Sequence, residues 1–256
     1  MKNTKITTAI GHRFGMFVES ITTGIQGTVV GITQCIAGCE ILEIKVKNDK
    51  GAMKSNYLSS KLVKIINSDK VAEYEKLFAQ TSHDMPFRLG DVVTDTVSEV
   101  TGTIGEIQYS VNTDPGVLLI KKWSEDDVEV YETARVMSCT STGQSIHDQL
   151  LENRKKRERG ELKVETLQRA RCMATGVTGL ITSVFNQASG TISVGIQPKG
   201  AQGKLLESHF TDIELVEVLE EKTKENVQTK KARKKPSGCV RSHELSCMKR
   251  KGMRAV

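Results

Sequence analysis

The chain has 256 residues, a net charge of +6 at pH 7 and only 4% aromatic side chains. So few aromatics disfavour the stacking platforms that proteins use to hold single-stranded nucleic acid. No run of 18 apolar residues occurs, and the basic residues 1–5 precede no apolar stretch of signal-peptide length. The sequence therefore predicts neither a membrane-spanning helix nor a secretory leader, and we expect a cytoplasmic protein.

A Thr-Gly-x-x-Gly phrase occurs three times and organises the chain. The copies begin at Thr23, Thr101 and Thr175, and a further glycine follows each copy 11 residues after its second glycine. Self-similarity at spacings of 78 and 74 residues indicates three related units. We interpret these glycines as structural turn positions, where a side chain would clash, in preference to a ligand site: Gly24, Gly27, Gly38, Gly102, Gly105, Gly116, Gly176, Gly179 and Gly190.

Short β-branched segments separated by glycine turns fill each unit. In the first unit, apolar and polar residues alternate through Ile41–Val46, and Asp49-Lys50-Gly51 is typical of a hairpin loop. About five such strands per unit predict a small barrel filled by its own side chains. The sequence therefore predicts a mainly β fold of three tandem barrels.

Helical connectors are expected between the units. The first places Val71, Tyr74 and Phe78 on one helix face, and the second is highly charged. The predicted organisation is repeat 1 at residues 12–66, a helical connector at 67–85, repeat 2 at 86–138, a charged helical connector at 139–165, repeat 3 at 166–218 and a basic, flexible tail at 219–256.

The positive charge is concentrated in the tail. Residues 229–256 hold 10 Lys and Arg against one acid, Glu244, whereas the first 228 residues hold 27 basic and 30 acidic side chains. Such a tail would neutralise phosphates without reading base sequence, and the alternatives are a solubilising extension or docking on an acidic protein surface. The candidate nucleic-acid-binding residues are Lys230, Lys231, Arg233, Lys234, Lys235, Lys249, Arg250, Lys251 and Arg254.

Longer strings in the repeats resemble a known group of proteins. Repeat 1 opens with Phe14–Gly27, repeat 2 with Leu89–Asp95, and repeat 3 closes with Phe210–Val218. These strings are similar to small proteins of tailed bacteriophages that carry a Phe-Gly-Asp-x-Val-x-Asp-x-Val-Thr-Gly-Phe-x-Gly phrase. The resemblance implies a bacteriophage origin and barrels of the Src-homology or KOW type. Repeat 2 departs from the pattern, since three extra residues precede its turn.

Residues that would support catalysis or metal binding are sparse. The five histidines do not recur at a repeat position, and no nucleophile elbow or phosphate loop occurs, so we predict no enzyme, no catalytic residue and no cofactor. Cys239, His243 and Cys247 are a weak metal candidate, because zinc usually takes four ligands. For Cys35 and Cys39, beside the Gly38 turn, free thiols are favoured over a local disulfide.

The leading hypothesis is a non-enzymatic bacteriophage protein, virion-associated or active in assembly. It would bind phage structural proteins through its tandem barrels, while the tail contacts DNA or an acidic surface. One alternative is a KOW-like accessory protein that binds DNA or RNA in infected cells. Another is a nucleotide sponge against host defence, which needs a pocket between barrels. The expected location is the host cytoplasm, with incorporation in the virion under the leading hypothesis.

Overall fold

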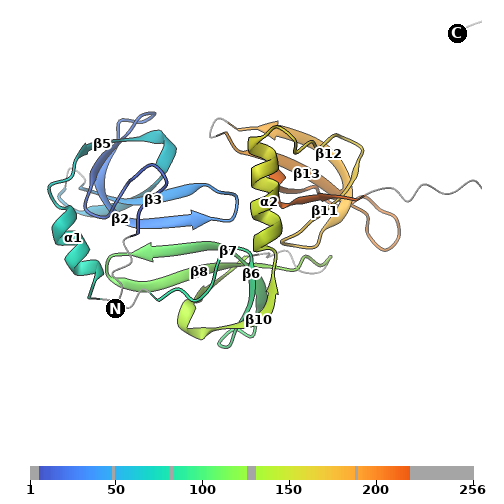
Figure 1. Ribbon diagram of the computed structural model, residues 1–256, viewed down its shortest axis with the longest axis horizontal. Coiled ribbons are helices and arrows are strands. Elements are labelled where there is room, and N and C mark those ends of the chain that lie inside the picture. The colour runs from blue at the N-terminus through green and yellow to red at the C-terminus, as the bar shows by residue number, and fades with distance from the viewer. Residues whose placement is uncertain (1–5, 48–49, 81–83, 126–130, 188–189, 220–256) are drawn as a thin grey trace, which may run out of the picture. The chain divides into compact units, whose positions relative to one another are not determined.

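A computed structural model describes residues 6–47, 50–80, 84–125, 131–187 and 190–219. These residues form 15 strands and two short α-helices, so the fold is mainly β, as predicted (Figure 1). The tail residues proposed for nucleic-acid binding, and Cys239, His243 and Cys247, lie outside the described residues. None of the described helices is both long and apolar enough to cross a membrane.

Each repeat contributes five strands with the same order in its sheet. The fifth strand of repeat 2 lies at residues 139–145, which were predicted to belong to the charged helical connector. Counted within a repeat, the order is fourth, third, second, first, fifth, and every neighbouring pair is antiparallel. The bounds are β1 Phe17–Ser20, β2 Gln26–Cys35, β3 Glu40–Lys47, β4 Met53–Ser59 and β5 Val63–Asn67 in repeat 1; β6 Asp91–Asp95, β7 Thr101–Ser110, β8 Thr113–Lys121, β9 Tyr131–Arg135 and β10 Cys139–Ser145 in repeat 2; and β11 Arg169–Cys172, β12 Thr178–Asn186, β13 Ile192–Pro198, β14 His209–Asp212 and β15 Val216–Val218 in repeat 3.

The prediction of three separate barrels is wrong, because repeats 1 and 2 share one curled half-barrel sheet of ten strands. The pairing of Gly31–Cys35 in β2 with Glu106–Ser110 in β7 joins them. The first strand of each repeat is short, so β1 covers only the start of β2 and β6 only the start of β7. The uncovered halves of the two long strands satisfy each other's backbone groups. Repeat 3 keeps a five-stranded sheet of its own.

Two helices connect the repeats. Helix α1, Val71–Phe78, buries Val71 and Phe78 and half-buries Tyr74 against the core of repeats 1 and 2, which confirms the predicted helix face. Helix α2, His147–Glu158, buries Leu150 against the core of repeat 3. That core also receives Ile36 from repeat 1 and Ile120 from repeat 2, so repeat 3 packs against both other repeats.

The motif glycines divide into two structural kinds, those in turns and those in strands. Gly24, Gly38, Gly176 and Gly190 lie in turns with φ between 70° and 81°, which is a conformation that glycine adopts without strain. Gly27 and Gly179 lie in β2 and β12 at close strand contacts, and a Cβ on Gly179 would lie 2.1 Å from the carbonyl oxygen of Gln197.

The turn interpretation is therefore wrong for Gly27 and Gly179, and it is also wrong for the three glycines of repeat 2. Gly102 and Gly105 lie inside β7, and Gly116 lies inside β8. The preceding turn instead places Glu99 at φ 60°, where repeats 1 and 3 have Gly24 and Gly176. Backbone bonds locate this position, since Asp95 N donates to Val100 O as Cys172 N donates to Val177 O. Gly102 therefore corresponds to Gly179, and this shift by three residues accounts for the apparent insertion.

Candidate functional site

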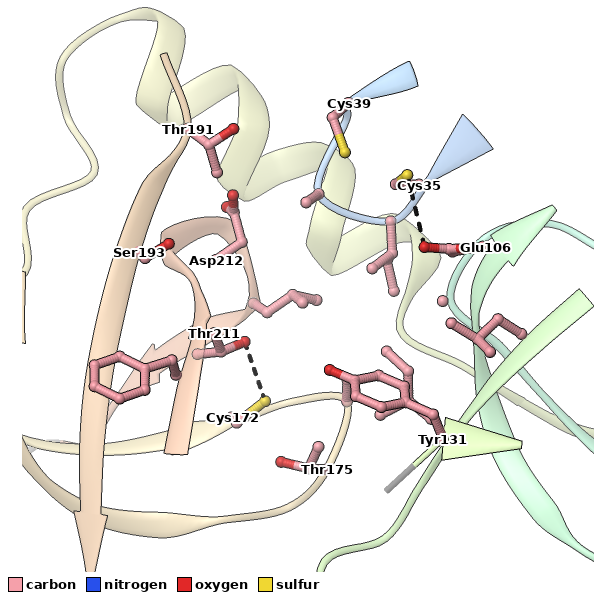
Figure 2. A pocket seen from close by; sticks show the side chains of 18 of the residues that line it. Cys35, Cys39, Glu106, Tyr131, Cys172, Thr175, Thr191, Ser193, Thr211 and Asp212 are labelled. Carbon is pink, nitrogen blue, oxygen red and sulfur yellow. Dashed lines mark hydrogen bonds between the residues drawn. The ribbon is translucent and has the colours of Figure 1, made fainter. Parts of the chain in front are cut away.

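A cavity of about 310 Å³ lies where the three repeats meet (Figure 2). Repeat 1 contributes the β2–β3 hairpin, repeat 2 contributes parts of β7, β8 and β9, and repeat 3 contributes β11, β13 and β14 with the adjoining turns. The polar lining residues are Cys35, Cys39, Glu106, Tyr131, Cys172, Thr175, Thr191, Ser193, His209, Thr211 and Asp212.

Hydrogen bonds hold the three walls of the cavity together. Ile36 N in the β2–β3 hairpin donates to Gly105 O at 2.7 Å, which joins repeats 1 and 2. Trp123 N donates to Thr175 O at 2.9 Å, which joins repeats 2 and 3. Because these bonds are made by backbone atoms on all sides, the cavity is a product of the packed repeats and belongs to no single one of them.

A buried ion cluster fixes the charged connector beside the cavity. The side chain of Glu214 is fully buried. Its Oε2 accepts a hydrogen bond from Arg154 Nε at 2.8 Å, and its Oε1 lies 2.7 Å from Arg157 Nη1. Arg154 Nη2 also donates to Ile36 O at 3.0 Å. Arg154 thus connects α2 to the hairpin of repeat 1 and to repeat 3.

Cys172 and His209 form the polar centre of the repeat 3 wall. Burial would raise the pKa of the Cys172 thiol, but hydrogen bonds involving His209, Thr175 and Thr211 outweigh it and lower the pKa to about 7. Cys172 Sγ lies 3.5 Å from Thr211 Oγ1, and Thr175 Oγ1 lies 3.3 Å from His209 Nε2. A thiol that ionises near neutral pH is a nucleophile in principle, but only 1% of Cys172 is exposed.

One carboxylate oxygen of Asp212 has no hydrogen-bond partner among the described residues. Its Oδ1 accepts a hydrogen bond from Glu214 N at 2.8 Å, whereas its Oδ2 is the buried, unpartnered atom. Burial raises the pKa of this carboxyl to about 6, and the negative charge of Glu214 adds to the effect. A carboxyl in this state is ionised at neutral pH at a cost in folding free energy.

Cys35 and Cys39 face each other across the hairpin as free thiols, in agreement with the favoured interpretation. Cys35 N donates to Cys39 O at 2.9 Å, and the Cys35 thiol also lies near Glu106 Oε1. A hydrogen bond from Cys35 lowers the pKa of Cys39 to about 7, and the same bond raises the pKa of Cys35. Cys39 is the more exposed of the two, so it is the reactive partner.

Sequence reasoning did not find this site. Of the cavity residues, the sequence suggests specific chemistry only for Cys35 and Cys39. His209 is one of the five histidines without a repeat position, Asp212 enters only as part of the Phe210–Val218 string, and no motif marks Cys172. Within the described ranges, no group of three or more His, Cys, Asp or Glu side chains is arranged to hold a metal ion. Comparison with known protein families, curated proteins and solved structures finds no match to this chain.

Proposed function

We propose that the chain is a non-enzymatic bacteriophage protein, associated with the virion or its assembly, that binds phage structural proteins around the inter-repeat cavity. The observation that carries this proposal is that all three repeats line one cavity. The bacteriophage origin rests on the sequence resemblance alone. The repeats would then act as one binding surface rather than as three independent modules.

An exposed aromatic pair supports partner binding at this place. Phe210 lines the cavity, is more than half exposed, and its ring centroid lies 6.0 Å from that of Phe185. Large exposed aromatics next to a cavity are typical of interfaces, where they supply apolar area with little loss of side-chain entropy.

The burial and hydrogen bonding of Cys172 and His209 favour a binding role for the cavity over a catalytic one. Cys172 and His209 are occupied by the hydroxyls of Thr211 and Thr175, and the thiol is almost completely buried. A nucleophile needs an approach path for the substrate, and burial blocks that path at Cys172, although His209 lies within hydrogen-bonding reach of the thiol. We therefore assign this cluster to the support of the cavity wall.

The cavity provides a site for the small-ligand alternative, but its lining does not suit a nucleotide. The lining includes the carboxylates of Glu106 and Asp212, and none of the described residues that line it is Lys or Arg. Nucleotide phosphates are bound by cationic side chains or by converging backbone N–H groups. A nucleotide is therefore a poor match, and the accessory-protein alternative depends on tail residues outside the described ranges.

Purified phage particles provide the test. We expect mass spectrometry to find the chain in gradient-purified virions or assembly intermediates, and the Phe185→Ser/Phe210→Ser variant to be depleted about tenfold or more. Val97→Ser is the matched control, because Val97 is a highly exposed apolar residue of a repeat 2 turn. Absence of the wild-type chain from all particles, or equal incorporation of the aromatic variant, would overturn the proposal.

Deleting residues 229–256 tests the role of the tail separately. The proposal expects particle association to persist and salt-sensitive DNA binding to be lost. The accessory-protein alternative would instead be supported by nucleic-acid binding without particle association. Equal DNA binding by the full and shortened chains would remove the tail from either function.

A further inference from the structure

The second strand of each repeat has one long edge that its own repeat leaves uncovered. β1 pairs only with Gln26–Thr28 of β2, β6 only with Thr101–Thr103 of β7, and β11 only with Thr178–Leu180 of β12. In repeats 1 and 2 the uncovered halves pair with each other. In repeat 3, the described residues provide no strand that pairs with the corresponding half of β12.

Shared irregularities align the three edges residue by residue. Each second strand has a register shift against its third strand, between Val29 and Gly31, between Ile104 and Glu106, and between Ile181 and Ser183. Two positions after each shift lie Thr33, Gln108 and Phe185.

The pairing of repeats 1 and 2 is symmetric about that shared position. Thr33 pairs directly with Gln108, so equivalent residues lie opposite each other at the centre of the contact. One position earlier, Ile32 and Ile107 also occupy equivalent places on either side. An antiparallel contact with this property has local two-fold symmetry, and two identical strands can make it.

Burial at the equivalent apolar position differs between the repeats. Ile32 is 0% exposed and Ile107 is 4% exposed, and both strands take part in the β2–β7 contact. The equivalent residue in repeat 3 is Val184, which is 38% exposed, and its neighbour Phe185 is 50% exposed. All three repeats thus have an apolar residue at this position, but it is buried only in repeats 1 and 2, where the edge of another long strand pairs with its strand.

We propose that β12 of one molecule pairs with β12 of a second copy of this chain, antiparallel and centred on Phe185. The contact would repeat the β2–β7 geometry between molecules, with Phe185 opposite its own counterpart and Val184 opposite Asn186. Ser183–Asn186 contains no charged residue and no proline, the two devices that commonly protect a free strand edge. Both this proposal and the particle association proposed above involve Phe185. Particle association is measured by incorporation into virions and the dimer by the mass of the isolated chain, so the failure of one is distinguishable from the failure of the other.

The test is the mass of the full chain in solution. Sedimentation equilibrium is expected to show dimers of the wild-type chain and to show association weakened about tenfold or more in Phe185→Lys, because two lysines would lie opposite each other. Leu180→Lys is the matched control: Leu180 is equally an exposed apolar residue of β12, but its edge is covered by Arg169 of β11. This variant is expected to dimerise like the wild type.

A charge exchange tests the register. Phe185→Lys and Phe185→Glu are each expected to be mainly monomeric, and an equimolar mixture is expected to recover the dimer, since Lys and Glu would then lie opposite each other. Phe185→Cys should form a disulfide-linked dimer under mild oxidation, whereas Leu180→Cys should not. A monomeric wild type at about 0.5 mM, an undiminished Phe185→Lys dimer, or no recovery on mixing would each overturn the proposal.

Discussion

Arg154 donates a 2.8 Å hydrogen bond to the fully buried carboxylate of Glu214, and this pair joins the charged connector to repeat 3. A carboxylate without exposure to water depends on its partners for compensation, and Arg157 supplies the second cation. The charged connector, to which the sequence alone assigns no specific role, therefore has a structural one.

Arg154→Met is expected to lower the free energy of unfolding by about 3 kcal/mol, because it leaves a buried charge with one partner fewer. Chemical denaturation at pH 7 measures this value. Arg159→Met is the control, since Arg159 is half exposed and pairs with Glu152 and Glu161 at the surface, where a much smaller loss of stability is expected. Equal losses for the two variants would contradict the role of the buried cluster.

Glu99→Gly is expected to stabilise the chain by roughly 0.5–1 kcal/mol. Glu99 has φ 60° in a turn whose counterparts are glycine, and a residue with a Cβ is strained in that conformation. The reverse change, Gly176→Ala, should cost a similar amount. Apart from the two neighbouring residues, no described residue has an atom within 4 Å of the added Cβ, so only the backbone conformation opposes the change. Thermal unfolding of both variants measures the effect, and a destabilised Glu99→Gly would contradict the assignment.

Gly179→Ala is expected to cost more than Gly176→Ala, by about 2 kcal/mol or more, for a different reason. Its Cβ would lie 2.1 Å from Gln197 O, so β12 and β13 must separate. Denaturant unfolding and near-ultraviolet circular dichroism would report the loss of stability and packing. A cost no larger than that of Gly176→Ala would show that the strands shift freely at this contact.

Asp212→Asn is expected to stabilise the chain at pH 8 and to have little effect at pH 4. The folded-state pKa of about 6 lies above the ordinary value of 3.8, so the folded state binds the proton more tightly, and the stability due to Asp212 is lost as pH rises through about 6. The expected gain at pH 8 is roughly 1–3 kcal/mol. Unfolding midpoints measured at pH 4, 6 and 8 would detect it, and a gain independent of pH would contradict the cause.

Asp95→Asn provides the control of opposite sign in the same experiment. Hydrogen bonds from Ser138 and Ser98 lower the pKa of Asp95 to about 2, so its contribution is present above about pH 4 and is lost as pH falls through about 2. This variant is expected to be destabilised at both pH 6 and pH 8.

Cys39 is expected to react with iodoacetamide faster than Cys172 at pH 7, although both thiols have a pKa near 7. Exposure separates them, because Cys172 is almost completely buried. The Cys39 rate should rise with a midpoint near pH 7, and Cys35→Ala should slow it by removing the hydrogen bond to the thiolate. Peptide mass spectrometry resolves each site, and equal rates for Cys39 and Cys172 would contradict the expectation.

Local patterns predicted the local structure well. The alternation in Ile41–Val46 lies within β3, and the face of Val71, Tyr74 and Phe78 packs as expected, because both depend on which side of one element meets a core. The sharing of a sheet by repeats 1 and 2 was not predictable in this way. The sequence pattern of the second half of β2 is the same whether its edge is exposed to solvent or paired with β7.

The cavity was hidden from sequence reasoning for a similar reason. Cys39, Glu106 and Asp212 belong to different repeats, and only the packing of the repeats brings them together. The motif glycines misled in repeat 2 because the Thr-Gly-x-x-Gly match is displaced by three residues, while the turn position itself is occupied by Glu99. The Thr-Gly-x-x-Gly phrase therefore located the three repeats, but in repeat 2 it did not identify the residue at the turn position.

The β2–β7 contact also has a consequence for synthesis of the chain on the ribosome. Repeat 1 ends its last strand at Asn67, yet its partner segment is complete only at Ser110. At translation rates of about 5–20 residues per second, the edge of β2 waits about 2–9 s for its partner. During that interval nascent chains on neighbouring ribosomes present identical open edges, so slow decoding between codons 67 and 110 would favour their aggregation over native folding.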